Sequence, residues 1–179
     1  MEKITLHDKS FRICIPNKQI EESIRKVAEQ INTDYKDVEC PLFLAVLNGS
    51  FMFAASLLKY INFECEISFV RLSSYCGTSS TGEVKQILGF NKPLEGRSVI
   101  VVEDIVDSGE TMVEMNKTLL SANVKDTKIC TLLFKPDAYK KDLKIDYVAM
   151  SIPNDFIVGF GLDYDELGRQ YKDIYVLDE

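Results

Sequence analysis

The chain has 179 residues, of which 46% are hydrophobic and 27% charged, and its formal net charge is −7. This length and composition predict one folded globular domain over residues 1–179 and exclude a disordered or fibrous chain. The negative charge provides no general attraction for nucleic acid or an anionic membrane. A polyanionic ligand would therefore have to be held locally, by backbone amides, a few cations or a metal ion.

The N-terminal segment lacks the basic start and apolar core of a signal peptide, and no later stretch is long and apolar enough to cross a bilayer. We therefore expect a cytoplasmic protein. The five scattered cysteines include no C-x-x-C pair, so they predict reduced thiols instead of a zinc site or a disulfide framework. The only histidine, His7, lies outside every motif and is expected at the surface.

The first predicted element is an amphipathic helix at Lys18–Asn32. Within it Ile20, Ile24 and Ile31 recur at helical spacing, and Asn17 is the candidate N-cap. This pattern predicts a helix with one face on the core.

Short apolar runs and helical patterns alternate along the rest of the chain. The run Leu42–Leu47 ends at Asn48-Gly49-Ser50 before a helical segment that starts at Phe51, and Val99–Val102 is followed by a helix beginning near Thr111. Such alternation predicts an α/β fold with a mostly parallel, doubly wound sheet flanked by helices. Ligands of these sheets bind beyond the carboxyl ends of the strands. The predicted strands are Leu42–Leu47, Glu66–Leu72, Val99–Val102, Lys128–Phe134, Tyr147–Ile152 and Ile174–Leu177.

The segment Ser73–Lys85 is small, polar and contains glycine, which predicts a long loop. Loops of this length in compact domains are often lids or binding loops. A solvated connection or the tip of a β-hairpin is an equally open alternative.

The stretch VVEDIVDSGETM places Glu103, Asp104 and Asp107 within five residues behind an apolar run. A strand that delivers Asp107 to Thr111 into a helix N-terminus presents unpaired N–H groups beside hydroxyls, which suits a phosphate. Glu103 and Asp104 would repel each other unless a cation or ligand hydroxyls lay between them. The stretch thus predicts a phosphorylated, hydroxyl-bearing ligand with a divalent metal. The alternative is that the acids only cap the helix and favour its dipole.

A longer match extends this interpretation. The stretch VIVVEDIVDSGETM resembles the phosphoribosyl pyrophosphate signature of the type I phosphoribosyltransferases. Further segments are similar to the hypoxanthine-guanine branch of that family, in the same order, over most of the chain from about Leu42. The resemblance implies the fold of that family, with a small hood and a mobile loop. These segments are LAVLNGSFMFAASLL, VRLSSYCGTSSTGEVK, TLLFKPDAY and IPNDFIVGFGLDYDELGRQY.

The resemblance implies roles for the acidic stretch. Glu103 and Asp104 would bind the ribose hydroxyls and an associated Mg2+, and Asp107 would be the general base near the purine N7. The loop around them would hold the ribose 5′-phosphate. Its implied residues are Asp107, Ser108, Gly109, Glu110 and Thr111.

The resemblance also implies a purine site. Lys135 would donate to the 6-oxo group, Phe156 would stack on the base, Ile157 would offer its backbone to the purine edge, and Asp163 would complete this site and bind a second Mg2+. Three alternatives stay open: Lys135 as a solvated strand end, Phe156 as a core aromatic and Asp163 as a turn former.

Pyrophosphate would be bound by Asn48, Gly49 and Arg169, and the mobile loop would carry Ser74 and Tyr75. Arg169 alone could instead pair with an acid one helical turn earlier, at Asp165 or Glu166.

Two positions depart from the family pattern. Many relatives carry a basic residue where this chain has Asn48, and Glu110 is an unusual neighbour for a phosphate. The family's cis peptide would fall between Leu47 and Asn48.

The implied activity is Mg2+-dependent transfer of the phosphoribosyl group from phosphoribosyl pyrophosphate to hypoxanthine or guanine, giving IMP or GMP and pyrophosphate, in a homodimer or homotetramer. Lys135 favours a 6-oxo base over adenine, because an ammonium can only donate. One alternative is the same reaction on another base such as xanthine. A second is an RNA-binding regulator built on this fold, which the acidic composition disfavours.

Overall fold

Two β-sheets and three α-helices make up the described part of the chain, residues 3–74, 84–88 and 93–178 of this computed structural model. None of the described helices is long and apolar enough to cross a membrane. In chain order the elements are β1 (Lys3–Leu6), β2 (Lys9–Ile15), α1 (Asn17–Asp34), β3 (Leu42–Leu47), α2 (Phe51–Leu58), β4 (Glu66–Ser74), β5 (Val84–Leu88), β6 (Ser98–Val106), α3 (Glu110–Ser121), β7 (Asp126–Phe134), β8 (Tyr147–Ser151), β9 (Ile157–Val158) and β10 (Ile174–Leu177).

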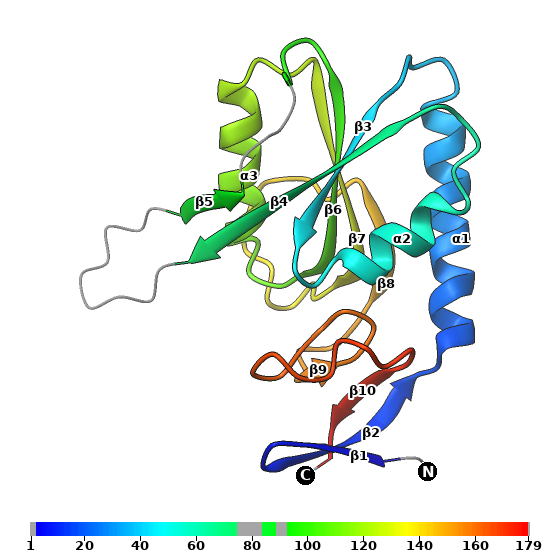
Figure 1. The fold of residues 1–179 in the computed structure, drawn as a ribbon, viewed down its shortest axis with the longest axis vertical. Coiled ribbons are helices and arrows are strands. Elements are labelled where there is room, and N and C mark those ends of the chain that lie inside the picture. Colours follow the sequence, from blue (N-terminus) through cyan, green and yellow to red (C-terminus); the bar gives the residue numbers. More distant parts are fainter. Residues whose placement is uncertain (1–2, 75–83, 89–92, 179) are drawn as a thin grey trace.

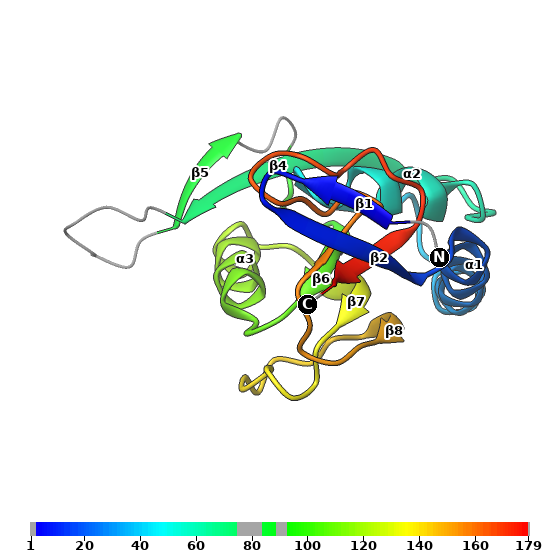
Figure 2. The same cartoon turned by 90° about the horizontal axis from the view of Figure 1, so that it is seen from below.

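The larger sheet has six strands in the order β5-β4-β3-β6-β7-β8. All neighbours in it are parallel except β4 and β5, which are antiparallel. Helices α1 and α2 cover one face of this sheet and α3 covers the other (Figure 2). The α/β fold predicted from the sequence, with a mostly parallel, doubly wound sheet, is therefore confirmed.

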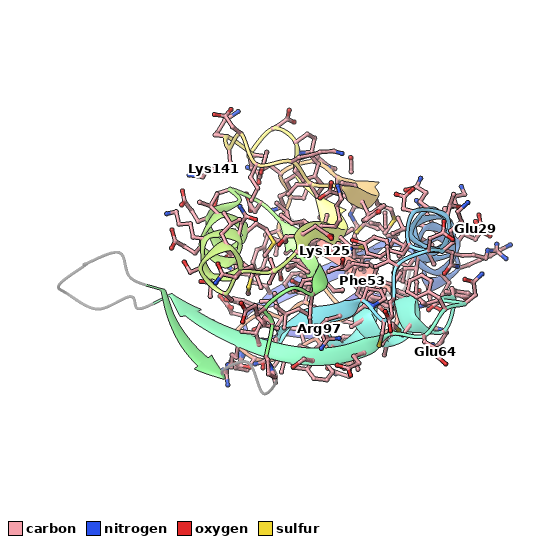
Figure 3. All side chains as sticks on the ribbon, turned by 90° about the horizontal axis from the view of Figure 1, so that it is seen from above. Glu29, Phe53, Glu64, Arg97, Lys125 and Lys141 are labelled. Carbon is pink, nitrogen blue, oxygen red and sulfur yellow. The ribbon has the colours of Figure 1, made fainter. Side chains whose placement is uncertain are left out.

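The core divides between the two faces of the larger sheet, because successive strand residues point to opposite sides. On β3, Phe43 packs in the cluster beneath α1 and α2, whereas its neighbour Leu44 packs in the cluster beneath α3. Figure 3 shows Phe53 of α2 within the first of these layers. The continuous apolar runs of β3 and β6 arise because both faces of these strands are buried.

The smaller sheet has the strand order β1-β2-β10-β9 and lies across the carboxyl ends of β3 and β6 (Figure 1). The first and last strands of the chain, β1 and β10, both belong to this sheet. It corresponds to the small hood that the family resemblance implies. The sequence pattern predicts β10 but not β1, β2 or β9; β9, with 2 residues, is too short to give a periodic signal.

The strand order changes direction at β3. From β3 the chain goes to β4 on one side and then returns to place β6 on the other. The strand pair β3–β6 is therefore the topological switch point, where doubly wound sheets bind their ligands. The register of this pair ends at Ala45 and Val102, although both strands continue.

Two predicted boundaries need correction. Asn17 is not the cap of α1: the helix begins with it, and its backbone N–H donates to Asp173 Oδ1 at 2.7 Å. A carboxylate distant in sequence thus caps this helix end. Strand β6 does not stop at Val102 but continues to Val106, so Glu103 and Asp104 lie inside the strand instead of after it.

The polar segment Ser73–Lys85 begins and ends in antiparallel strands. Ser73 pairs with Lys85 and Ser74 with Val84, which supports the β-hairpin alternative for both ends of the segment. Residues 75–83 between them, with the predicted loop residue Tyr75, lie outside the described residues.

The packing of α2 predicts different effects for two phenylalanines of that helix. Phe53 is fully buried and Phe51 is 42% exposed. We expect Phe53→Ala to lower the free energy of unfolding by about 3–5 kcal/mol, and Phe51→Ala to lower it by less than about 1 kcal/mol. Urea denaturation of the two variants measures both changes; equal losses would contradict the described packing.

Candidate active site

A cavity of about 350 Å³ opens at the carboxyl ends of β3 and β6, where the two strands separate. It unites seven of the predicted site residues, which come from the β3–α2 turn, β6, α3 and the segment after β9. Val46, Leu47 and Ile105 also line it. The seven predicted residues are Asn48, Gly49, Glu103, Asp104, Thr111, Asp163 and Arg169.

Glu103 and Asp104 are both buried in this cavity wall, with 7% and 9% of their surface exposed. Burial, together with repulsion from the Asp104 carboxylate, raises the pKa of Glu103 well above that of an ordinary glutamate. Its Oε2 atom is buried without a hydrogen-bond partner among the described residues. An unpaired buried carboxylate oxygen is costly, which indicates that a ligand or cation completes this group.

The turn after β3 leaves space for these acids only because residue 49 is glycine. A Cβ atom at Gly49 would overlap the Asp104 carboxylate. The peptide between Leu47 and Asn48 is cis, as the resemblance implies. The turn and the acid pair thus lie against each other in one cavity wall, although they are far apart in sequence.

A second cavity of about 90 Å³ adjoins the first at Glu103, Ile105 and Thr111. It is formed by the turn from β6 into α3, where Gly109 takes a φ of 84°. The first N–H groups of α3 have no acceptor within the helix, so they are free to bind an anion. The remaining predicted residues of the phosphate loop line this cavity: Asp107, Ser108, Gly109 and Glu110.

Lys135 connects this loop to the end of β7. Its ammonium lies 3.3 Å from Asp107 Oδ2, and its side chain is only 10% exposed, whereas that of Asp107 is 52% exposed. The alternative that Lys135 is an ordinary solvated strand end is therefore wrong. The buried ammonium can donate a hydrogen bond to a ligand, and the half-exposed carboxylate beside it can accept one from the same ligand.

The segment after β9 closes the opposite side of the main cavity. Arg169 Nη2 lies 2.9 Å from Asp163 Oδ1 and 3.4 Å from Glu166 Oε2, and its Nη1 donates to the Gly161 carbonyl. Asp163 Oδ2 also accepts the Glu166 N–H. The turn-forming role of Asp163 and the pairing of Arg169 with Glu166 are thus both present, yet both side chains still line the cavity.

Phe156 and Ile157 are not brought into this cavity. Phe156 is 45% exposed and lines another cavity together with Arg12 and Asp178. The alternative that it is a core aromatic is therefore wrong. Its ring meets Tyr164 edge-on, at 5.6 Å between centroids, and Ile157 pairs with Val176 in the small sheet.

Three residues that contribute to the site were not predicted from the sequence. Ile105 lines both cavities, and its place two residues after Glu103 on the same strand was a signal that could have identified it. Tyr139 and Lys141, in the segment between β7 and β8, contact the predicted phosphate loop at Gly109 and Glu110. No local pattern in the sequence indicates these contacts.

The acid pair fits a hard cation that shares its coordination with a ligand. No group of three or more His, Cys, Asp or Glu side chains in the described ranges could hold a metal ion by itself. Mg2+ commonly binds through one or two carboxylates and completes its shell with water and substrate oxygens. The unpaired Glu103 Oε2, beside Asp104, provides donors of that kind.

Comparison with known proteins gives a consistent result. The family profile described as the phosphoribosyl transferase domain matches residues 16–165. The hypoxanthine-guanine phosphoribosyltransferase of Streptococcus pyogenes serotype M3 is 41% identical over 169 residues, which cover 94% of this chain and 93% of that protein. The solved hypoxanthine-guanine phosphoribosyltransferase of Bacillus anthracis, with a HEPES molecule in its active site, has a TM-score of 0.86 at 38% identity and covers 94% of this chain and 97% of its own.

A third relative is the hypoxanthine phosphoribosyl transferase of Trypanosoma cruzi, solved to study the role of its C-terminal region in oligomeric state and enzymatic activity. It has a TM-score of 0.88 at 32% identity, and the match covers 98% of this chain and 95% of that chain.

The raised pKa of Glu103 predicts a pH-dependent gain in stability for Glu103→Gln. A carboxyl whose pKa is raised on folding holds its proton more tightly when folded, so its stabilising contribution is lost as pH rises through that pKa. In metal-free buffer, we expect the melting temperature of Glu103→Gln relative to the unmodified protein to rise by roughly 2–5 °C between pH 5 and pH 8. Calorimetry at both pH values measures this.

The matched control is Glu29→Gln on the exposed side of α1, which Figure 3 labels. Its relative melting temperature should be the same at both pH values. A Glu103→Gln difference that stays constant or falls toward pH 8 would contradict the burial of this carboxyl.

Proposed function

This chain belongs to the phosphoribosyl transferase family. From that premise, we propose that it transfers the phosphoribosyl group from phosphoribosyl pyrophosphate to hypoxanthine or guanine, giving IMP or GMP and pyrophosphate. The observation that carries the proposal is the junction of β6 and α3, where a buried acid pair and an open helix N-terminus line adjoining cavities. A ribose with a phosphate on one end needs such a combination of hydroxyl acceptors and anion donors.

In the proposed complex, the ribose hydroxyls lie on Glu103 and Asp104, and the 5′-phosphate lies in the turn from Asp107 to Thr111. Displacement of pyrophosphate from the sugar C1 develops positive, oxocarbenium-like charge on the ribose. The buried carboxylates stabilise that charge, because an electrostatic interaction is stronger away from water.

The purine is proposed to lie between β6 and the small sheet, where Asp107 and Lys135 face it together. Lys135 donates to the 6-oxo group, and Asp107 accepts the proton from the purine ring as the new bond forms. Their 3.3 Å separation supports joint contact with one base. Phe156 offers an exposed ring for stacking, and Ile157 its backbone.

The pyrophosphate is proposed to bind the wall formed by Asn48, Gly49 and Arg169. Because Asn48 has no charge, Arg169 is the cationic side chain of this cavity lining. Mg2+ is the proposed cofactor, held by Glu103, Asp104 and, at a second position, Asp163. When bound, Mg2+ offsets the negative charge of the leaving pyrophosphate and orients it.

The proposed assembly is a homodimer or homotetramer. Ile67 and Phe69 lie two residues apart on one face of β4, and each is 37% exposed. Large apolar side chains exposed together on one strand face favour association. The Trypanosoma cruzi relative has itself been studied for its oligomeric state.

The reaction is tested with phosphoribosyl pyrophosphate, Mg2+ and each of hypoxanthine, guanine, xanthine and adenine in turn. We expect nucleotide formation from hypoxanthine and guanine and none from adenine. Asp107→Asn should lower kcat by about 10²-fold or more, because the amide cannot accept the proton. The control Asp37→Asn, at a carboxylate 87% exposed, should leave kcat unchanged. Failure of all four bases would refute the proposed function.

The metal is tested separately by removal and titration. A chelator should abolish turnover and excess Mg2+ should restore it. For Asp104→Asn, the Mg2+ concentration that gives half-maximal rate should rise by roughly tenfold or more. Full activity in the presence of the chelator would exclude the proposed cofactor role.

A further inference from the structure

Glu110 introduces an electrostatic conflict at the proposed phosphate site. It is the first residue of α3 and lines the small cavity together with Ser108 and Gly109. An acid in the first turn of a helix is favoured by the helix dipole. The same negative charge repels a phosphate bound at that helix end, so it would weaken substrate binding unless it were compensated.

Lys141 provides the compensating charge. Its ammonium forms an ion pair with Glu110 Oε1 across 31 residues of sequence. The Lys141 side chain is 29% exposed and that of Glu110 is 67% exposed. Figure 3 shows Lys141 on the segment between β7 and β8, beside α3. The lysine is therefore the more enclosed member of the pair, and it reaches the acid from a segment on the same face of the large sheet as α3.

The segment that carries Lys141 is fixed to the phosphate loop by Tyr139. A Cβ atom at Gly109 would overlap the Tyr139 ring, so this ring covers the glycine of the loop directly. Tyr139 also meets the Phe134 ring at 5.3 Å between centroids, and its hydroxyl donates to the Leu143 carbonyl. These contacts fix the backbone two residues before Lys141. The packing of Tyr139 therefore helps to position the Lys141 ammonium.

We propose that Lys141 is a positioning residue for the phosphate end of the substrate, acting through Glu110. It neutralises the Glu110 carboxylate and holds it on the segment between β7 and β8, so that the anion cradle of α3 keeps its affinity for phosphate. This inference rests on the proposed function. It assigns a role to a residue that lies outside the acidic signature and is not among the residues that line the two site cavities.

The test is a double-mutant cycle on steady-state kinetics, with Lys141→Met, Glu110→Gln and both together. Lys141→Met leaves Glu110 uncompensated and should raise KM for phosphoribosyl pyrophosphate on the order of 3- to 10-fold, with kcat and the purine KM within about twofold of normal. Glu110→Gln should not raise that KM. In the double variant the KM should return to the Glu110→Gln value, because no unpaired acid remains.

Salt and a matched control sharpen the result. The effect of Lys141→Met should shrink between about 0.01 M and 0.3 M salt, because screening weakens the repulsion from exposed Glu110. Lys117→Met removes the lysine of another ion pair on the same helix, Lys117 with Glu114 at 2.7 Å, and should leave KM unchanged. The thermal stability of all variants is measured alongside.

Three outcomes would overturn the inference while the proposed function stands. One is an unchanged KM in Lys141→Met. A second is a raised KM that Glu110→Gln does not rescue, which would indicate direct contact of Lys141 with phosphate. A third is a fall in both kcat and melting temperature in Lys141→Met, which would indicate a structural role only. Absence of turnover in the unmodified protein would overturn the proposed function and this inference with it.

Discussion

The separation of β3 from β6 beyond Ala45 and Val102 is the constraint on which the site depends. Up to that pair the strands share a ladder, and beyond it β6 continues alone on that side as far as Val106. The backbone and side chains of its last residues therefore face a cavity instead of another strand. The chain reverses its winding direction at the same place, so the sheet topology and the cavity have one origin.

This arrangement explains how two neighbouring acids can be buried. Glu103 and Asp104 sit on a strand whose β7 side remains paired, which fixes the backbone firmly while the β3 side is open. The paired side of β6 holds the two carboxylates in position, and the open side leaves room for a cation or ligand that neutralises their charge. The segment between β9 and β10 completes the enclosure from the other side through Asp163 and Arg169, which already form an ion pair with each other. One wall of the cavity thus has a carboxylate oxygen without a partner among the described residues, whereas the charged groups of the facing wall are already paired.

Local sequence patterns predicted the parts of the fold that have a local cause. The apolar run Leu42–Leu47 gave a strand with unchanged boundaries. The acids and glycine of the β6–α3 turn indicated the proposed phosphate site, because strand end, turn and helix start are contiguous in sequence. The family resemblance then indicated Lys135 and Arg169, which come from distant segments.

The sequence failed where the cause is tertiary. The capping of α1 by Asp173 depends on a residue 156 positions away, so Asn17 looked like a cap when it is not. The predicted strand ended too early, at Val102, because the charged residues that follow are unusual inside a buried strand. Lys141 could not be identified for the same reason: its significance lies entirely in which residue it meets across the fold.

The contact between Lys135 and Asp107 has a further consequence for ligand choice. With one positive and one negative group in mutual contact, this corner of the site carries no net charge before a ligand arrives. An uncharged heterocycle that can both accept from the ammonium and donate to the carboxylate replaces the contact without creating an unbalanced charge. A base that is ionised at the working pH would leave one of the two groups uncompensated. If the purine binds at this corner as proposed, discrimination there depends on the ionisation state of the incoming ring as well as on its hydrogen-bonding pattern.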